Sequence, residues 1–137
     1  MNNQIYRLIA LFGIFLGLAV TGVRAQAPSK VEVNIPFEFS AGKTTLKAGV
    51  YTIKRLSGDN LTFRSADGQS SVILNAPVTH NSSDPNSVER LVFSKRGEQY
   101  FLAQIWLTAD TGREVWTDKK PQKSETVEIA LRPFAKR

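Results

Sequence analysis

Several residue types that carry chemistry are scarce in this sequence. It contains no cysteine and only one histidine among 137 residues. Without cysteine there is neither a disulfide framework nor a thiol for lipid attachment. One histidine cannot form a histidine metal cluster, and a Ser-His-Asp triad would have to use His80, in the polar segment 80–87 (HNSSDPNS) that we expect to be a mobile loop. With no glycine-rich phosphate loop present, we predict no catalytic residue, no metal site and no cofactor, and stability from a packed core.

Long apolar runs are also absent, apart from one near the start of the chain. Residues 8–20 (LIALFGIFLGLAV) follow Arg7 and precede TGVRA. This run is shorter than the ~20 residues that span a bilayer. A basic residue, a short apolar segment and small residues are typical of a secretory signal peptide. Because Val23 and Ala25 suit cleavage, we expect a signal peptide over residues 1–25, a mature chain from Gln26, and a secreted or periplasmic protein without a transmembrane segment in its mature form.

Strong charge is missing from the remaining residues 26–137, which are long enough for a single domain. Loss of Arg7 and Arg24 with the leader lowers the net charge from +6 to +4. The densest basic cluster, Lys119, Lys120 and Lys123, surrounds a proline. Other charges are scattered, so we expect no nucleic-acid partner.

A helical stripe is absent too, and alternation takes its place. Val31, Val33, Ile35, Phe37 and Phe39 share one face of an extended segment, and Val127, Ile129 and Leu131 repeat the pattern. Glycines fall between such segments rather than within them. Strands about ten residues apart predict an all-β domain, either an antiparallel β-sandwich or a flattened barrel of about 7–9 short strands. Pro36 cannot donate to a ladder, so we expect its strand at an edge or with a bulge.

Turn residues predict the register of two hairpins. Asp67 and Gly68 favour a type I′ turn that sets Phe63 opposite Val72 and Leu61 opposite Leu74, all facing the core. In SKRGEQ, we predict a three-residue loop over 95–97 with Gly97 left-handed. That loop places Leu91 and Phe93 on the face that holds Phe101, Ala103, Ile105 and Leu107.

The segment LKAGVYTI, residues 46–53, predicts a corner rather than a site. Ala48 and Gly49 interrupt the alternation, so Leu46 points into the core before the chain bends, and Tyr51 and Ile53 then resume inward positions. Tyr51 could instead line a pocket, but a tyrosine with a buried ring and its hydroxyl at a rim is common in β-sandwiches.

PFEF, LKAGVYTI and LVFSKRGEQYFLAQIW together resemble a group of small secreted β-rich proteins of Acidobacteria and related soil bacteria. The resemblance spans most of residues 26–137. It implies export and a β fold, and it assigns no functional residue.

One sheet face is a candidate binding surface. Tyr100, Gln104 and Trp106 alternate away from the expected core, beside Arg90 on the neighbouring strand. A three-residue loop over 110–112 would pair Ala109 with Arg113 and set Trp106 opposite Trp116. Aromatic rings among Arg and Gln could bind a glycan, a small amphipathic ligand or an envelope component. Alternatively, this face is a second packed face, covered by a sheet or loop.

We therefore expect a non-catalytic binding or cell-envelope-associated β module, with Arg90, Tyr100, Gln104, Trp106 and Trp116 as candidate ligand-binding residues. The alternative is a small secreted hydrolase that acts on envelope or extracellular polymers. A pocket lined by converging carboxylates would favour the hydrolase, and an open aromatic face would favour binding.

Overall fold

The computed structural model describes residues 30–117 and 124–133, and the expected leader, the Gln26 terminus and the Lys119–Lys123 cluster lie outside them. Every regular element in these ranges is a strand. The strands are β1 (Lys30–Ile35), β2 (Phe39–Ala41), β3 (Thr44–Leu46), β4 (Gly49–Arg55), β5 (Asn60–Ser65), β6 (Ser71–Asn75), β7 (Val78–Asn81), β8 (Arg90–Arg96), β9 (Gln99–Trp106), β10 (Thr111–Glu114), β11 (Glu125–Ala130) and β12 (Arg132–Pro133).

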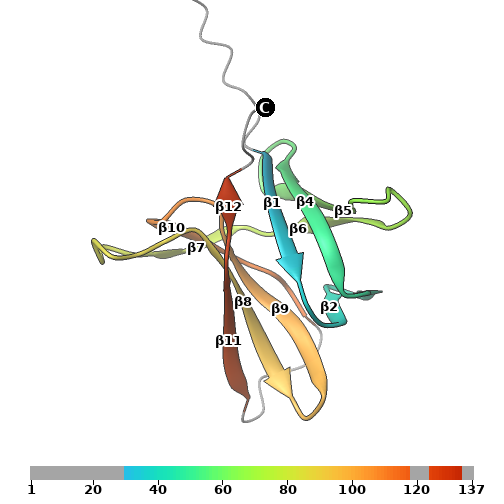
Figure 1. Cartoon of the computed structure of the whole chain (residues 1–137). Coiled ribbons are helices and arrows are strands. Elements are labelled where there is room, and N and C mark those ends of the chain that lie inside the picture. Colours follow the sequence, from blue (N-terminus) through green and yellow to red (C-terminus); the bar gives the residue numbers. More distant parts are fainter. Residues whose placement is uncertain (1–29, 118–123, 134–137) are drawn as a thin grey trace, which may run out of the picture.

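These strands form two sheets that face one another, which confirms the expected all-β, largely antiparallel, sandwich-like fold. A five-stranded sheet has the order β12-β1-β4-β5-β6, and a seven-stranded sheet has the order β11-β8-β9-β10-β7, with β2 and β3 attached beside β9. Figure 1 shows β4 and β5 toward the upper right and β8, β9 and β11 in the lower part of the molecule. The described residues contain more strands than the 7–9 expected. The additional strands, β2, β3, β7 and β12, are only two to four residues long, which is too short for alternation in the sequence to reveal.

The core lies between the two sheets. β1 has strictly alternating burial, with Val31, Val33 and Ile35 inward. Across the core, the seven-stranded sheet contributes Phe93, Leu102 and Ile105, all nearly fully buried. Near the C-terminus, Val127 and Ile129 are partly buried and Leu131 is buried, as their alternation predicted. Burial of apolar area stabilises such a core by ~25 cal/mol per Å².

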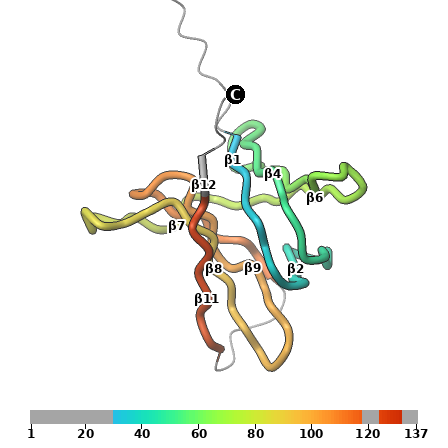
Figure 2. Tube along the Cα trace, viewed as in Figure 1, coloured from blue at the N-terminus to red at the C-terminus, as the bar shows by residue number. Residues whose placement is uncertain are grey.

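The strand expected to run from Val31 to Phe39 is divided between the sheets. Ile35 pairs with Gly49 in the five-stranded sheet, whereas Phe39 pairs with Leu46 and Tyr100 in the other. The trace in Figure 2 follows this crossing from β1 to β2. Our expectation of an edge strand or a bulge at Pro36 was wrong, because β1 lies between β12 and β4. A proline, which has no N–H for a ladder, instead lies where the chain leaves the sheet.

The segment after β3 is the predicted corner. Leu46, Tyr51 and Ile53 are all buried, and Lys47 and Ala48 carry the chain from the seven-stranded to the five-stranded sheet. Gly49 has a φ of +157°. The Tyr51 hydroxyl donates a 2.6 Å hydrogen bond to the Lys47 carbonyl oxygen, which closes the bend. Desolvation, with a smaller contribution from the Asp67 charge, raises the pKa of Tyr51.

The β5–β6 hairpin has the predicted register but not the predicted turn. Leu61 pairs with Leu74 and Phe63 with Val72, as expected. Gly68 is left-handed at φ +73°, but Asp67 has a negative φ, whereas a type I′ turn requires positive φ at both central residues. Instead, the Gly68 N–H bonds to the Ser65 carbonyl, and the Asp67 carboxylate accepts hydrogen bonds from the Ser65 hydroxyl and the Gln69 N–H. Side-chain capping of this kind stabilises the longer loop.

The β8–β9 hairpin differs from the predicted one. Arg96 pairs with Gln99, so the loop has two residues, and Gly97 at φ +59° occupies its first position. Val92 pairs with Gln104 but Phe93 pairs with Leu102, which leaves Ala103 as an extra residue in β9. This β-bulge reverses which side chains of β9 face the core. Leu102 is therefore a core residue, and Phe101 lies outside the core cluster that we expected it to join.

Candidate functional site: an aromatic groove and a closed outer face

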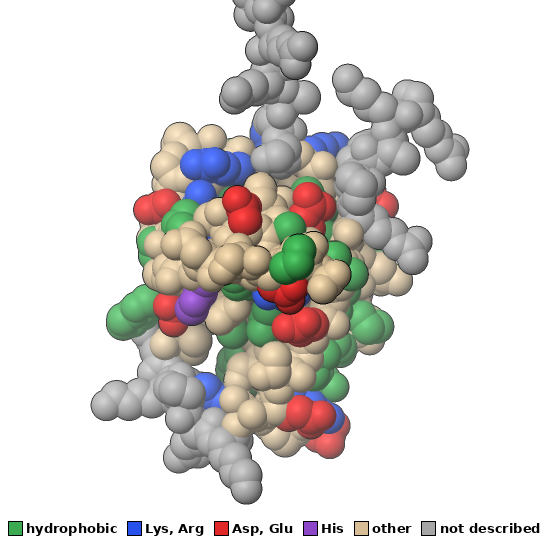
Figure 3. All heavy atoms as spheres, turned by 90° about the vertical axis from the view of Figure 1, so that its left-hand side faces the viewer, with side chains coloured by type: hydrophobic (Ala, Val, Ile, Leu, Met, Phe, Trp, Pro, Cys, Tyr) green, Lys and Arg blue, Asp and Glu red, His purple; other side chains and the backbone are tan. Residues whose placement is uncertain are grey.

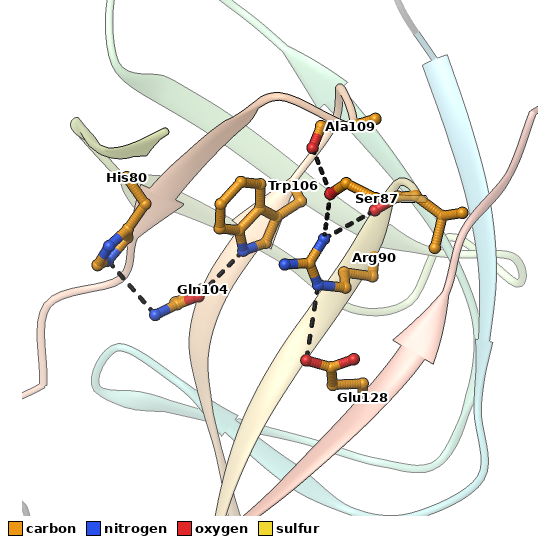
Figure 4. Close-up of polar contacts among 8 residues, drawn as sticks. His80, Ser87, Arg90, Gln104, Trp106, Ala109 and Glu128 are labelled. Carbon is orange, nitrogen blue, oxygen red and sulfur yellow. Dashed lines mark hydrogen bonds and ion pairs between the residues drawn. The ribbon is translucent and has the colours of Figure 1, made fainter. Parts of the chain in front are cut away.

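The outer face is the face of the seven-stranded sheet that points away from the core, and Trp106 is at its centre. The indole is only 5% exposed and does not belong to the core cluster. Its Nε1–H donates a 3.0 Å hydrogen bond to Gln104 Oε1 (Figure 4). The Arg90 guanidinium lies 4.2 Å from the indole centroid, and the His80 ring is stacked at 6.2 Å. Trp106 is thus enclosed, as in the packed-face alternative.

Arg90 connects this face to the loop before β8. Its Nη1 donates to Ser87 Oγ at 3.1 Å and to the Val88 carbonyl at 3.0 Å, and its Nε lies 3.6 Å from Glu128 Oε1. Ser87 Oγ in turn donates to the Ala109 carbonyl at 2.6 Å (Figure 4). These bonds position the guanidinium over the indole, and they leave no open aromatic surface there for a ligand to stack on.

His80 lies in β7, not in the loop where we expected it. Its Nε2 is 3.3 Å from Gln104 Nε2 and 4.0 Å from Glu114 Oε2. Figure 3 shows the histidine at the surface beside acidic side chains. The polar segment that follows is tied down by hydrogen bonds, including one from the Ser82 N–H to the Asp110 carbonyl.

The structure brings together three of the five candidate ligand-binding residues: Arg90, Gln104 and Trp106. Because of the bulge at Ala103, Tyr100 lies on the core side, where its ring is stacked on Phe37 at 3.8 Å. The predicted pairing of Trp106 with Trp116 is wrong, since Arg113 pairs with Ile105. Trp116 follows β10, is 75% exposed, and makes no ring contact with Trp106 among the described residues.

A separate groove lies where β2 runs parallel to the start of β9. Phe39 pairs with Tyr100 there, and Ser40 pairs with Phe101. The groove has a volume of about 290 Å³. Its lining comprises Phe37, Glu38, Phe39, Ser40, Thr45, Glu98, Gln99, Tyr100 and Phe101. This volume is close to the lower limit of ~300 Å³ for ligand pockets.

The groove combines an aromatic stack with polar side chains. Phe37 and Tyr100 lie face to face with an interplanar angle of 12°, and both rings are partly exposed. Glu38 and Glu98 are exposed carboxylates, and the basic side chains Lys95 and Arg96 lie over two lining rings, Tyr100 at 5.6 Å and Phe101 at 5.1 Å. Such a surface offers π faces together with hydrogen-bond donors and acceptors.

Of the groove residues, sequence reasoning proposed only Tyr100, and on the wrong face. The parallel pairing of β2 with β9 joins segments some sixty residues apart through a three-residue strand. Alternation cannot reveal so short a strand. The sequence did contain one signal: PFEF and GEQYF each place a glutamate within two residues of an aromatic residue.

No family model matches the chain, and no match was found among the curated proteins or the solved structures. Residues 30–117 and 124–133 include no helix with the length and apolarity needed to cross a membrane. Within the same residues, no group of three or more His, Asp or Glu side chains is arranged to hold a metal ion.

Proposed function

We propose that this protein is an exported, non-catalytic binding module associated with the cell envelope or the extracellular space, and that it binds a neutral saccharide segment in the groove between β2 and β9. Export is supported by the leader-like residues 1–25. Binding is supported by a groove among the described residues that combines partly exposed aromatic rings with polar side chains.

The stacked pair Phe37–Tyr100 is the observation that carries the proposal. The apolar face of a sugar ring packs against aromatic rings, and its hydroxyls bond to side chains such as Ser40, Thr45 and Gln99, which line the same groove. Glu38 and Glu98 can accept hydrogen bonds from hydroxyls. Lys95 and Arg96, over Tyr100 and Phe101, balance the two carboxylates, so the groove carries no net charge, which favours an uncharged ligand.

A hydrolase remains the second candidate, because two carboxylates line one groove. Glycoside hydrolases use such a pair, one as acid and the other as nucleophile or base. Binding is favoured over hydrolysis by exposure: Glu38 and Glu98 both lie in solvent, whereas a catalytic acid is typically kept in apolar surroundings.

The test is a glycan and envelope-fraction binding screen with purified protein, followed by a titration of the best neutral oligosaccharide. Gln99→Ala should weaken binding about two- to tenfold, since a lost hydrogen bond to the ligand is worth ~0.5–1.5 kcal/mol. Gln69→Ala, in the exposed β5–β6 turn, is the matched control and should bind like the original protein. Equal affinities of the two variants for the oligosaccharide would contradict binding in the groove.

The same preparations separate binding from hydrolysis. The binding proposal predicts that the oligosaccharide is recovered intact after prolonged incubation. Cleavage that is lost in both Glu38→Gln and Glu98→Gln would establish the hydrolase instead. N-terminal sequencing of the protein from the periplasm or medium tests export: we expect Gln26, and an intact residue 1 in a membrane fraction would contradict it.

A further inference from the structure

A hydrogen-bond chain on the outer face fixes the orientation of one amide. The Trp106 indole N–H can only donate, so the atom of Gln104 that it meets at 3.0 Å must be the carbonyl oxygen. The Gln104 NH₂ group therefore points the other way, toward His80 (Figure 4). No choice of amide rotamer reverses this order without placing two donors together.

The orientation of Gln104 in turn fixes the state of His80. An amide NH₂ group is only a donor, so the His80 Nε2 at 3.3 Å must accept. A histidine nitrogen that accepts carries no proton, so the ring in this structure is neutral with its proton on Nδ1. Protonation at Nε2 would set one donor against another.

A second partner is available to the protonated ring. Glu114 Oε2 lies 4.0 Å from the same Nε2. Two arginines near the hydrogen-bond chain have other partners. Arg90 lies across the indole and contacts Glu128, and Arg113 on β10 is buried against Asp59. Glu114 is therefore the carboxylate placed to receive an Nε2 proton.

We propose that His80, Gln104 and Trp106 form a proton-operated latch on the outer face. When His80 is neutral, it accepts from Gln104 and holds the amide that in turn holds the Trp106 indole. When His80 is protonated, its Nε2–H turns to Glu114, and the Gln104 NH₂ loses its acceptor. A proton taken up at His80 Nε2 therefore operates the latch. This inference is independent of the groove and of its ligand.

The test is nuclear magnetic resonance of the purified, ¹⁵N-labelled protein, titrated from about pH 8 to about pH 5, the range in which histidine changes charge. The ring ¹⁵N shifts of His80 should identify the Nδ1-protonated tautomer at the alkaline end. The Trp106 indole N–H signal should move with the same midpoint as the His80 ring signals. The exposed Trp116 indole is an internal control and should not follow that midpoint.

His80→Gln is the diagnostic variant, because its amide oxygen can accept from Gln104 but cannot titrate. In this variant the Trp106 signal should be independent of pH over the same range. Three results would overturn the latch: an Nε2-protonated tautomer at about pH 8, a Trp106 signal that stays fixed while His80 titrates, or an unchanged Trp106 titration in His80→Gln. The tautomer result comes from the original protein and so holds even if the variant does not fold.

Discussion

Gly112 and Trp106 show how one residue without a side chain positions a large one. A Cβ built on Gly112 would lie 2.5, 2.6 and 2.9 Å from three carbons of the Trp106 indole. The ring therefore lies against the backbone of β10, with Arg90 on the indole as well. Glycine is required at this position by the close approach of the ring, not by an unusual φ, since Gly112 has none.

Gly112→Ala should thus lower the free energy of unfolding by about 1–3 kcal/mol, because the rigid indole must move to admit the methyl group. Urea denaturation measures the effect. In a Trp106→Leu background, the same alanine should cost much less, since the clashing ring carbons are gone. Equal costs in the two backgrounds would contradict this account of Gly112.

The Asp67 side chain makes the stability of the fold depend on pH. The Ser65 hydroxyl, followed by the Gln69 N–H, holds the pKa of Asp67 below its usual value of 3.8. The folded state therefore favours the carboxylate, and this stabilisation is complete above the unfolded pKa and lost as pH falls through the folded pKa.

Asp67→Asn should accordingly be less stable than the original protein near neutral pH, and the gap should narrow between about pH 5 and about pH 2. Thermal unfolding at a series of pH values provides the measurement. A gap that stays constant across this range would show that ionisation of Asp67 contributes nothing.

At the scale of elements, the bend between β3 and β4 depends on one hydroxyl. Tyr51→Phe removes the 2.6 Å hydrogen bond to the Lys47 carbonyl while it keeps the buried ring. The variant should lose about 0.5–1.5 kcal/mol of stability. Tyr100→Phe is the matched control, since the Tyr100 hydroxyl makes no hydrogen bond within the described residues, and its unfolding midpoint should be nearly unchanged. Equal losses in the two variants would argue against the corner bond.

The elements also show which registers a sequence can predict. The β5–β6 pairing was predicted correctly because alternation and the position of Gly68 favour the same register, even though the turn is longer than type I′. The β8–β9 pairing was not, because neither pattern nor turn residue marks Ala103 as a bulge. That one inserted residue moved Tyr100 away from the other candidate binding residues.

The prediction of the hairpin after β9 was wrong for a different reason. We took Gly112 as the last residue of a three-residue loop over 110–112, but it lies within β10 under the Trp106 ring. A glycine needed for close packing and a glycine needed for a turn look alike in one sequence. The candidate site consequently lost Trp116, and the β2–β9 groove, made by a long-range parallel contact, could not be foreseen.

For the molecule as a whole, Arg113 is a bridge between the sheets. It is 7% exposed, and its Nη1 donates to the Ala76 carbonyl at 2.9 Å and to Asp59 Oδ1 at 3.2 Å. Asp59 belongs to the β4–β5 turn and Ala76 to the β6–β7 crossing, while Arg113 is on β10. One guanidinium on β10 thus ties these two connections together.

Arg113→Met should destabilise the fold by about 1–3 kcal/mol, because it leaves the buried Ala76 carbonyl without this donor. Asp59→Asn should cost less, about 1 kcal/mol at most, since the Asp59 side chain is 49% exposed and the ion pair is screened. Chemical denaturation of both variants measures the two losses of stability. A larger loss from Asp59→Asn would mean that the charge, not the carbonyl contact, holds the two connections together.

The central functional claim is that the molecule binds through the groove between β2 and β9 and not through its outer face. The most direct measurement is a nuclear magnetic resonance titration of the ¹⁵N-labelled protein with the neutral oligosaccharide that binds best. We predict that saturable amide shifts gather at Ser40, Thr45 and Gln99, with the Trp106 and Trp116 indole signals unmoved. Shifts that gather instead at the two indoles and Gln104, with the groove amides unmoved, would contradict the claim.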